Sequence, residues 1–182
     1  MKKTFFAMAL TAIVLAAGGL YLHSKSRESA ESIENLANRE TALAVKDWKA
    51  CKNKQYGYEA KYPPTWTTFI PVSGGRAPMP CGTENQSQIE FSLSAKGTPV
   101  ISLEASFESW FYGNTLHSLD DYIASSSLKH RQLEKLMIDG EKAVSEEGKW
   151  IYTFHKGDVF RFSFYGVDKE TTEQFLSAFR FN

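Results

Sequence analysis

The feature that most limits how this chain can fold is the alternation of apolar and polar residues in four of its segments. These segments are residues 88–94, 100–107, 150–155 and 159–165. Successive side chains of an extended strand point to opposite faces, so a period of two predicts strands with one buried and one solvated face. The last segment places Phe160, Phe162 and Phe164 in one inward row. Another layer of the protein has to cover such a row.

Turn residues predict that several of these strands pair as hairpins. Lys156-Gly157-Asp158 separates the last two alternating segments and is typical of a Gly-containing hairpin turn. The other expected strands are residues 56–62 and 66–70. Strands that are joined in this way run antiparallel.

Two helices are expected from the residues that cap their first turns. Ser118 precedes Asp121 by three residues, as in a capping box, and Asp168 is a candidate N-cap for a second helix. The second helix places Phe175 and Phe179 on one face. Many hairpin strands with few helices indicate an α+β fold, in which helices pack on an antiparallel β-sheet.

Five groups of residues resemble motifs of PsbP-like domains. They are Tyr56-Gly57-Tyr58 with Tyr62-Pro63 and Trp66; Leu119 with Tyr122-Ile123; Ile138-Asp139-Gly140 with Ala143; residues 152–164; and Phe175-Leu176 with Phe179. The resemblance covers residues 56–182 and implies an α/β/α sandwich around an antiparallel sheet. Members of this group are typically auxiliary or binding proteins without a shared catalytic site, so the resemblance assigns no catalytic residue. The long stretch between Ile70 and Gln88 departs from it.

Residues 1–23 are interpreted as a signal-anchor or signal peptide. Lys2 and Lys3 precede an uncharged run of 18 residues that begins at Phe5 and ends at Leu22. This length is at the short end of what crosses a hydrocarbon core about 30 Å thick, and the two lysines predict that the rest of the chain is exported. We expect a single-pass protein of the cytoplasmic membrane with a periplasmic C-terminal domain. Cleavage near Ala16, which would release the domain into the periplasm, is the alternative.

Residues 24–50 are expected to form a charged helical stalk. The segment is rich in Ser, Glu, Lys and Ala, lacks Pro and Gly, and has only scattered apolar residues. A helix of this length would span about 40 Å and hold the domain away from the bilayer. The extracytoplasmic domain is then residues 51–182.

Cys51 and Cys81 are the only cysteines, and both follow the apolar run. In an oxidising compartment two such residues usually form a disulfide. The bond would close a loop of about 31 residues and stabilise the fold by about 3–4 kcal/mol in the chain-entropy model. Two free thiols are the alternative.

The charge balance argues against nucleic acid as a partner. The chain has 21 basic and 21 acidic residues, and Lys2 and Lys3 precede the exported part, which is therefore weakly acidic. A nucleic-acid-binding protein needs a basic face to neutralise phosphates.

Motifs for catalysis or metal binding are missing from the sequence. The histidines are His23, His117, His130 and His155, and no two have the i, i+4 spacing of a helical zinc site. His155 adjoins a turn, where we expect a solvated or turn-bonded imidazole. There is no G-x-S-x-G elbow and no phosphate-binding loop. We expect no cofactor, no metal and no catalytic residue.

Two segments are candidates for binding a partner. Residues 71–87 form a polar connection rich in Gly and Pro, which includes Arg76 and Met79 and would be pinned by Cys81. Trp110-Phe111-Tyr112 follow a strand, and three adjacent aromatic side chains cannot all face one core. Packing of all three beneath the neighbouring helix is the alternative.

Three functions follow from these observations. The first is a membrane-tethered extracytoplasmic module that binds another envelope protein without catalysis. The second is a cell-envelope hydrolase acting on the wall or on carbohydrate, which would need two converging carboxylates. The third is a carrier of a small ligand. The partner and the oligomeric state do not follow from the sequence.

Overall fold

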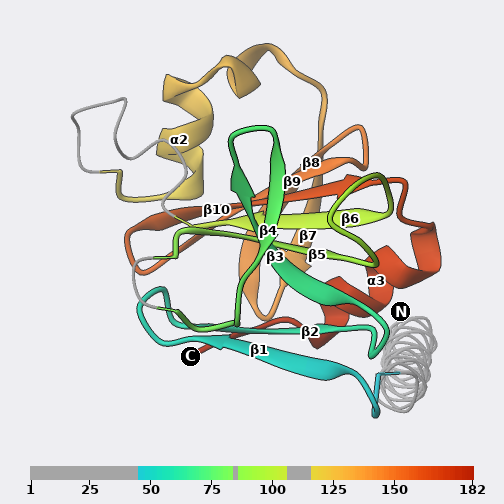
Figure 1. Ribbon diagram of the computed structural model, residues 1–182. Coiled ribbons are helices and arrows are strands. Elements are labelled where there is room, and N and C mark those ends of the chain that lie inside the picture. The colour runs from blue at the N-terminus through green and yellow to red at the C-terminus, as the bar shows by residue number, and fades with distance from the viewer. Residues whose placement is uncertain (1–44, 84–85, 106–115) are drawn as a thin grey trace, which may run out of the picture. The chain divides into compact units, whose positions relative to one another are not determined.

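Each of the four alternating segments contributes a strand to one antiparallel sheet of eight strands in the computed structural model, which describes residues 45–83, 86–105 and 116–182 (Figure 1). The strand order is β4-β3-β5-β6-β10-β9-β8-β7. The strands are β3 (Thr67–Val72), β4 (Gly75–Pro78), β5 (Gln88–Ser92), β6 (Val100–Glu104), β7 (Leu133–Ile138), β8 (Glu141–Glu146), β9 (Trp150–His155) and β10 (Asp158–Tyr165). The predicted hairpin is confirmed, because His155 pairs with Asp158 across the turn.

A smaller sheet of three strands has the order β1-β2-β11. Its strands are β1 (Lys49–Asn53), β2 (Tyr58–Tyr62) and β11 (Arg180–Phe181). The chain end is held here, because the backbone N–H of Asn182 donates to the carbonyl of Gly57 at 2.8 Å. Burial raises the pKa of Tyr58 in β2 to about 12, partly offset by a hydrogen bond with Asn53.

Helices cover both faces of the large sheet, as the α+β prediction requires. They are α2 (Leu119–Ser125), the 3₁₀ helix η1 (Ser127–His130) and α3 (Lys169–Ala178). Figure 1 shows α2 on one side of the sheet and α3, with β1 and β2, on the other. Both predicted caps are confirmed: Ser118 Oγ accepts from the N–H of Asp121 at 3.1 Å, and Asp168 Oδ1 accepts from the N–H of Thr171 at 2.8 Å.

The main core lies between the large sheet on one side and α3 with the smaller sheet on the other. Phe160, Phe162 and Phe164 of β10 are buried in it, so the predicted inward row is confirmed. Phe175 of α3 and Phe179, which directly follows the helix, pack against this row, and the ring centroids of Phe162 and Phe179 are 5.0 Å apart. On the opposite face a second core joins α2 to β8, β9 and β10.

The connection expected at residues 71–87 is partly strand. β3 extends to Val72, and β4 pairs with it from Gly75 to Pro78. The tight turn between them reverses the chain and lets the edge strand form hydrogen bonds. The long polar loop therefore begins only after Pro78, and residues 84–85 lie outside the described part of the chain.

The predicted disulfide is confirmed. Cys51 in β1 bonds Cys81, with Cα atoms 5.3 Å apart. Gly82 follows with φ of +79°, and a Cβ there would lie 2.7 Å from the carbonyl oxygen of Lys52. The bond and this close approach hold the connection after β4 against the smaller sheet.

The sequence predicted a membrane segment and a helical stalk in the N-terminal part of the chain. The membrane segment, residues 1–23, and most of the stalk lie outside the described residues, and β1 begins at Lys49. Within the described part of the chain, no helix has both the length and the apolar character that crossing a bilayer requires.

Replacing Cys51 and Cys81 together by Ala should lower the free energy of unfolding by about 3–4 kcal/mol, because the unfolded chain is no longer cross-linked. Urea denaturation followed by circular dichroism measures the loss. Reductant should have the same effect on the wild type and none on the double variant. Equal stability of the oxidised wild type and the double variant would contradict the role given to the bond.

Candidate functional site

The structure places the predicted binding residues in different parts of the chain. Arg76 lies in β4 and Met79 directly after it, where Met79 N–H donates to the carbonyl of Thr68 at 3.1 Å. Trp110, Phe111 and Tyr112 lie outside the described residues. Of the five predicted positions, Arg76 is the one that lines a described cleft.

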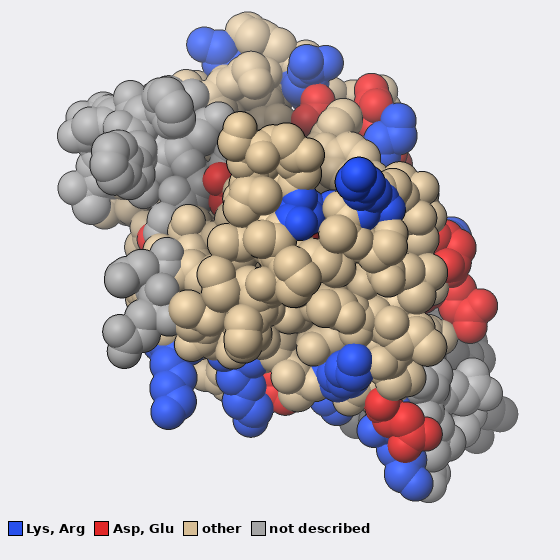
Figure 2. Space-filling view, viewed as in Figure 1, with Lys and Arg blue, Asp and Glu red and all other residues tan. Residues whose placement is uncertain are grey.

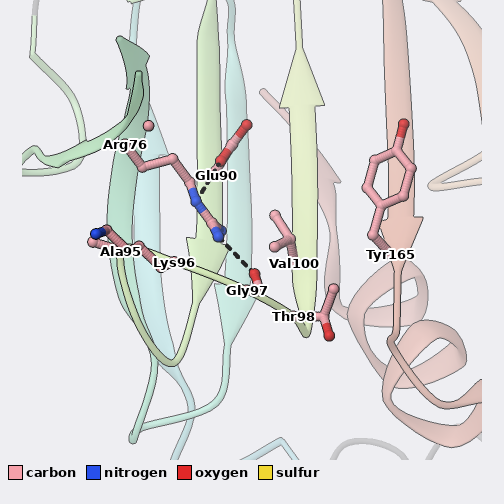
Figure 3. A pocket seen from close by; sticks show the side chains of 9 residues that line it. Arg76, Glu90, Ala95, Lys96, Gly97, Thr98, Val100 and Tyr165 are labelled. Atoms are coloured by element: carbon pink, nitrogen blue, oxygen red, sulfur yellow. Dashed lines mark hydrogen bonds and ion pairs between the residues drawn. The ribbon is translucent and has the colours of Figure 1, made fainter. Parts of the chain in front are cut away.

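The cleft has a volume of about 510 Å³ and lies on the face of the sheet opposite α3. Its lining residues come from β4, β5, β6, the end of β10 and the loop between β5 and β6: Gly75, Arg76, Glu90, Ala95, Lys96, Gly97, Thr98, Val100 and Tyr165. Figure 3 shows Arg76 pointing across β5 toward Glu90 and Gly97, with Val100 and Tyr165 beyond them. The surface over β3 and β4 is largely uncharged, with scattered lysines and arginines (Figure 2).

Arg76 is held in place by three neighbours. Its Nε lies 3.5 Å from Glu90 Oε2, and its Nη2 donates to the carbonyl of Gly97 at 2.6 Å. The guanidinium also lies over the ring of Phe69, 5.9 Å from the centroid. The side chain is 12% exposed, and Nη1 is buried without a hydrogen-bond partner among the described residues. These contacts hold the arginine in place, and the two N–H groups of its Nη1 form no hydrogen bond with the described residues.

Glu90 is the carboxylate of this ion pair, and its side chain is 15% exposed. Burial raises its pKa above the ordinary value, and the charge of Arg76 acts in the opposite direction. Desolvation is the larger effect, so Arg76 compensates only part of the cost of burying this charge. The pair orients Arg76, because a buried carboxylate needs its cationic partner in contact.

Tyr165 forms the other wall and is 46% exposed. It pairs across strands with Val100 of β6, and its hydroxyl accepts from Trp150 Nε1 at 3.3 Å. The next residue, Gly166, lies so close to Thr98 that a Cβ would come within 2.8 Å of the Thr98 side chain. This contact sets the β5–β6 loop against the end of β10 and closes that end of the cleft.

His155 lies on the other face of the sheet and differs from the expectation of a solvated or turn-bonded imidazole. Its side chain is 12% exposed, its Nδ1 lies 2.9 Å from Glu141 Oε1, and its ring stacks on Phe181 with centroids 4.2 Å apart. The expectation failed because β11 brings the chain end over the hairpin, a contact between distant segments. The described residues contain no group of three or more His, Cys, Asp or Glu side chains that could hold a metal ion.

Sequence reasoning missed Glu90, Lys96 and Tyr165. Glu90 stands at a polar position of an alternating strand, where solvent is the usual neighbour, and Tyr165 ends another such strand. Their proximity depends on strand order: Phe69 pairs with Glu90, and Pro71 of the same strand pairs with Arg76. The only signal in the sequence was the polar connection that contained Arg76.

Comparisons with known proteins find similarity in fold. No family model and no curated protein matches the chain. A crystal structure from Bacteroides thetaiotaomicron is similar with a TM-score of 0.43 and 14% identity over 69% of this chain, which spans only 45% of that one. Cyanobacterial PsbP (CyanoP) from Synechocystis is similar with a TM-score of 0.41 and 12% identity, over 74% of this chain and 92% of that one.

The second of these structures belongs to the group that the sequence motifs resemble. No residue role, ligand or partner is transferred from either structure to this chain, because both TM-scores are below 0.5.

The titration of Glu90 tests whether burial raises the pKa of this carboxyl more than the charge of Arg76 lowers it. Its midpoint, followed by NMR of the side-chain carboxyl carbon, should lie above the ordinary value of 4.5, and Arg76→Met should raise it further because the lowering charge is gone. A raised folded-state pKa means that the folded protein binds more protons, so the contribution of Glu90 to stability should fall as the pH rises above 4.5. A midpoint below 4.5, or one that Arg76→Met lowers, would contradict this account.

Proposed function

We propose that this protein is a membrane-tethered, extracytoplasmic accessory module that binds another envelope protein and has no catalytic activity. In this proposal residues 1–23 are an uncleaved anchor, the residues from 24 to the start of β1 at Lys49 are a spacer, and the cleft around Arg76 is the binding surface. The resemblance of the sequence motifs to PsbP-like domains, which are typically auxiliary proteins, supports the general role.

The observation that carries the proposal is that a fixed Arg76 and an exposed Tyr165 line the same open cleft. Arginine and tyrosine are enriched among residues that dominate binding free energy at protein interfaces. Arg76 is already held by Glu90 and Gly97, so little side-chain entropy is lost when a partner binds. A rigid arginine and an amphipathic ring that line the same cleft are suitable anchors for a protein surface.

The charges of the cleft favour a partner that presents a carboxylate or a carbonyl oxygen. Arg76 and Lys96 are positive and Glu90 is negative, so the lining carries one more cation than anion. Nη1 of Arg76 is itself buried, so a partner's oxygen would be attracted by the charge of the guanidinium and of Lys96 and would not bond that atom.

The number of carboxylates that line the cleft supports binding rather than glycoside hydrolysis. A glycosidase of the common type uses two carboxylates that flank the scissile bond. Among the residues that line this cleft Glu90 is the one carboxylate, and it is engaged by Arg76. Glu90 therefore serves to orient the arginine.

A photo-crosslinking amino acid at Tyr165, in full-length protein expressed in its own cells, should form an adduct with one envelope protein. Arg76→Ala should abolish that adduct, because the anchor of the cleft is lost. The matched control is the same crosslinker at Lys169, which is 88% exposed on α3 at the other face. Adducts that are the same from both positions, or unaffected by Arg76→Ala, would refute the proposed surface.

The anchor predicts that the full-length protein sediments with membranes, resists extraction by salt and is released by detergent. Protease added to the periplasmic side should digest residues 45–182 and leave the first residues protected. The N-terminus should not begin within the apolar run. A soluble periplasmic protein that begins near Gly18 would show that the leader is cleaved and would remove the tether.

A further inference from the structure

The strand β7 ends the large sheet on the side opposite to β4. Its inner side pairs with β8 over six residue pairs, from Leu133 with Glu146 to Ile138 with Glu141. No strand within the described part of the chain pairs with its outer side. An unpaired edge offers a row of backbone N–H and C=O groups to another extended chain.

The turn after β7 determines which of its backbone groups point outward. Asp139 and Gly140 have φ of 48° and 84°, as in a two-residue type I′ turn, so the flanking pair Ile138 and Glu141 is hydrogen-bonded. Hydrogen-bonded and non-hydrogen-bonded pairs alternate along an antiparallel ladder. The outward N–H and C=O groups are therefore those of Leu133, Lys135 and Met137.

The side chains of these three residues lie on the α2 face of the sheet. Leu133 packs against the core beneath α2, whereas Met137 is 61% exposed. Lys135 and Met137 line a groove of about 250 Å³, which is otherwise bounded by Leu119, Asp120, Leu136, Lys142, Ala143 and Val144. An exposed methionine on a strand edge is an adaptable apolar contact for a partner.

Positive charge flanks this methionine. Lys135 lies two residues before Met137, and Lys142 is its partner across the ladder. Both lysines are exposed, and neither forms an ion pair with any residue that the structure describes. Asp120 is the one carboxylate in the groove lining. An incoming strand thus meets the apolar side chain of Leu133, the basic one of Lys135 and the apolar one of Met137, which are alternate residues of β7 on this face.

We propose that β7 is a strand-addition site for an extended segment of a partner protein in which an acidic residue stands between two apolar residues at alternate positions. The acidic side chain would lie opposite Lys135, and the apolar ones would lie opposite Leu133 and Met137. The backbone of the segment would pair with the outward groups of these residues, a common mode of peptide recognition. Opposite charges on facing strands stabilise such pairing.

A second copy of this chain fits the edge poorly. If two β7 strands paired antiparallel with Met137 opposite Leu133, each Lys135 would face the other Lys135. Like charges that are directly opposite destabilise a ladder, and lysine on an edge strand is a known means of preventing self-association. The edge therefore selects an acidic partner segment over its own copy. The proposed site on β7 is independent of the Arg76 cleft, which lies at the β4 end of the same sheet.

The test uses the full-length chain in detergent and a capped peptide of sequence Thr-Val-Thr-Glu-Thr-Val-Thr. The peptide should bind in fluorescence anisotropy and protect the amides of Leu133, Lys135 and Met137 from hydrogen exchange. The same peptide with Lys in place of Glu should bind at least about fivefold more weakly. In the variant Lys135→Glu this preference should reverse, because the facing charge is inverted.

The matched control is Lys54→Glu, which changes an exposed lysine in the turn between β1 and β2 and should leave both affinities unchanged. Unaltered circular dichroism of both variants ensures that the comparison is between folded proteins. The proposal is overturned if neither peptide binds, if Lys135→Glu does not alter the preference, or if the protected amides belong to β4. A concentration-dependent dimer with protection at β7 would likewise contradict it, since the occupant would then be a second copy.

Discussion

The packing of α3 onto the phenylalanine row of β10 is the interaction on which the rest of this structure depends. Phe179 contacts Phe162 of the large sheet and stacks on Tyr58 of the smaller one, with ring centroids 5.0 and 5.7 Å apart. Phe179 thus contacts both sheets, which also touch directly through Tyr58 and Phe160. Aromatic pairs of this kind contribute about 0.5–1.5 kcal/mol each beyond the burial of their surface. α3 and the smaller sheet together shield the inward face of the large sheet from water.

Closing one face in this way leaves the other face for binding. Where α2 does not cover it, this second face carries polar side chains on neighbouring strands, such as Arg161 of β10, which pairs with Glu104 of β6 at 2.7 Å. Arg76 and Glu90 continue the same pattern toward the β4 edge. Charged groups that are half-buried and paired in this way present fixed geometry to a partner. The strand order then separates the two proposed binding surfaces to opposite ends of the sheet.

Local sequence predicted the parts of the fold that depend on local interactions. Ser118 and Asp168 were identified as caps because a capping side chain bonds a backbone group only three residues away. The disulfide was predicted from the expected export of the chain and from the number of its cysteines. The strands β7 and β8 were not predicted, because Leu133–Ile138 does not alternate strictly and its pairing partner supplies the stabilisation. The candidate cleft was found only in part, through Arg76.

The sequence by itself determined the inward phenylalanine row, the caps, the hairpin turn and the fold class, because the period of side-chain burial and the chemistry of capping act over a few neighbouring residues. Tertiary structure alone decided that Glu90 meets Arg76, that Tyr165 lines the same cleft and that β7 is an edge. These results depend on the order of strands in the sheet. That order is set by packing between distant segments, and it has no signature in any short stretch of the chain.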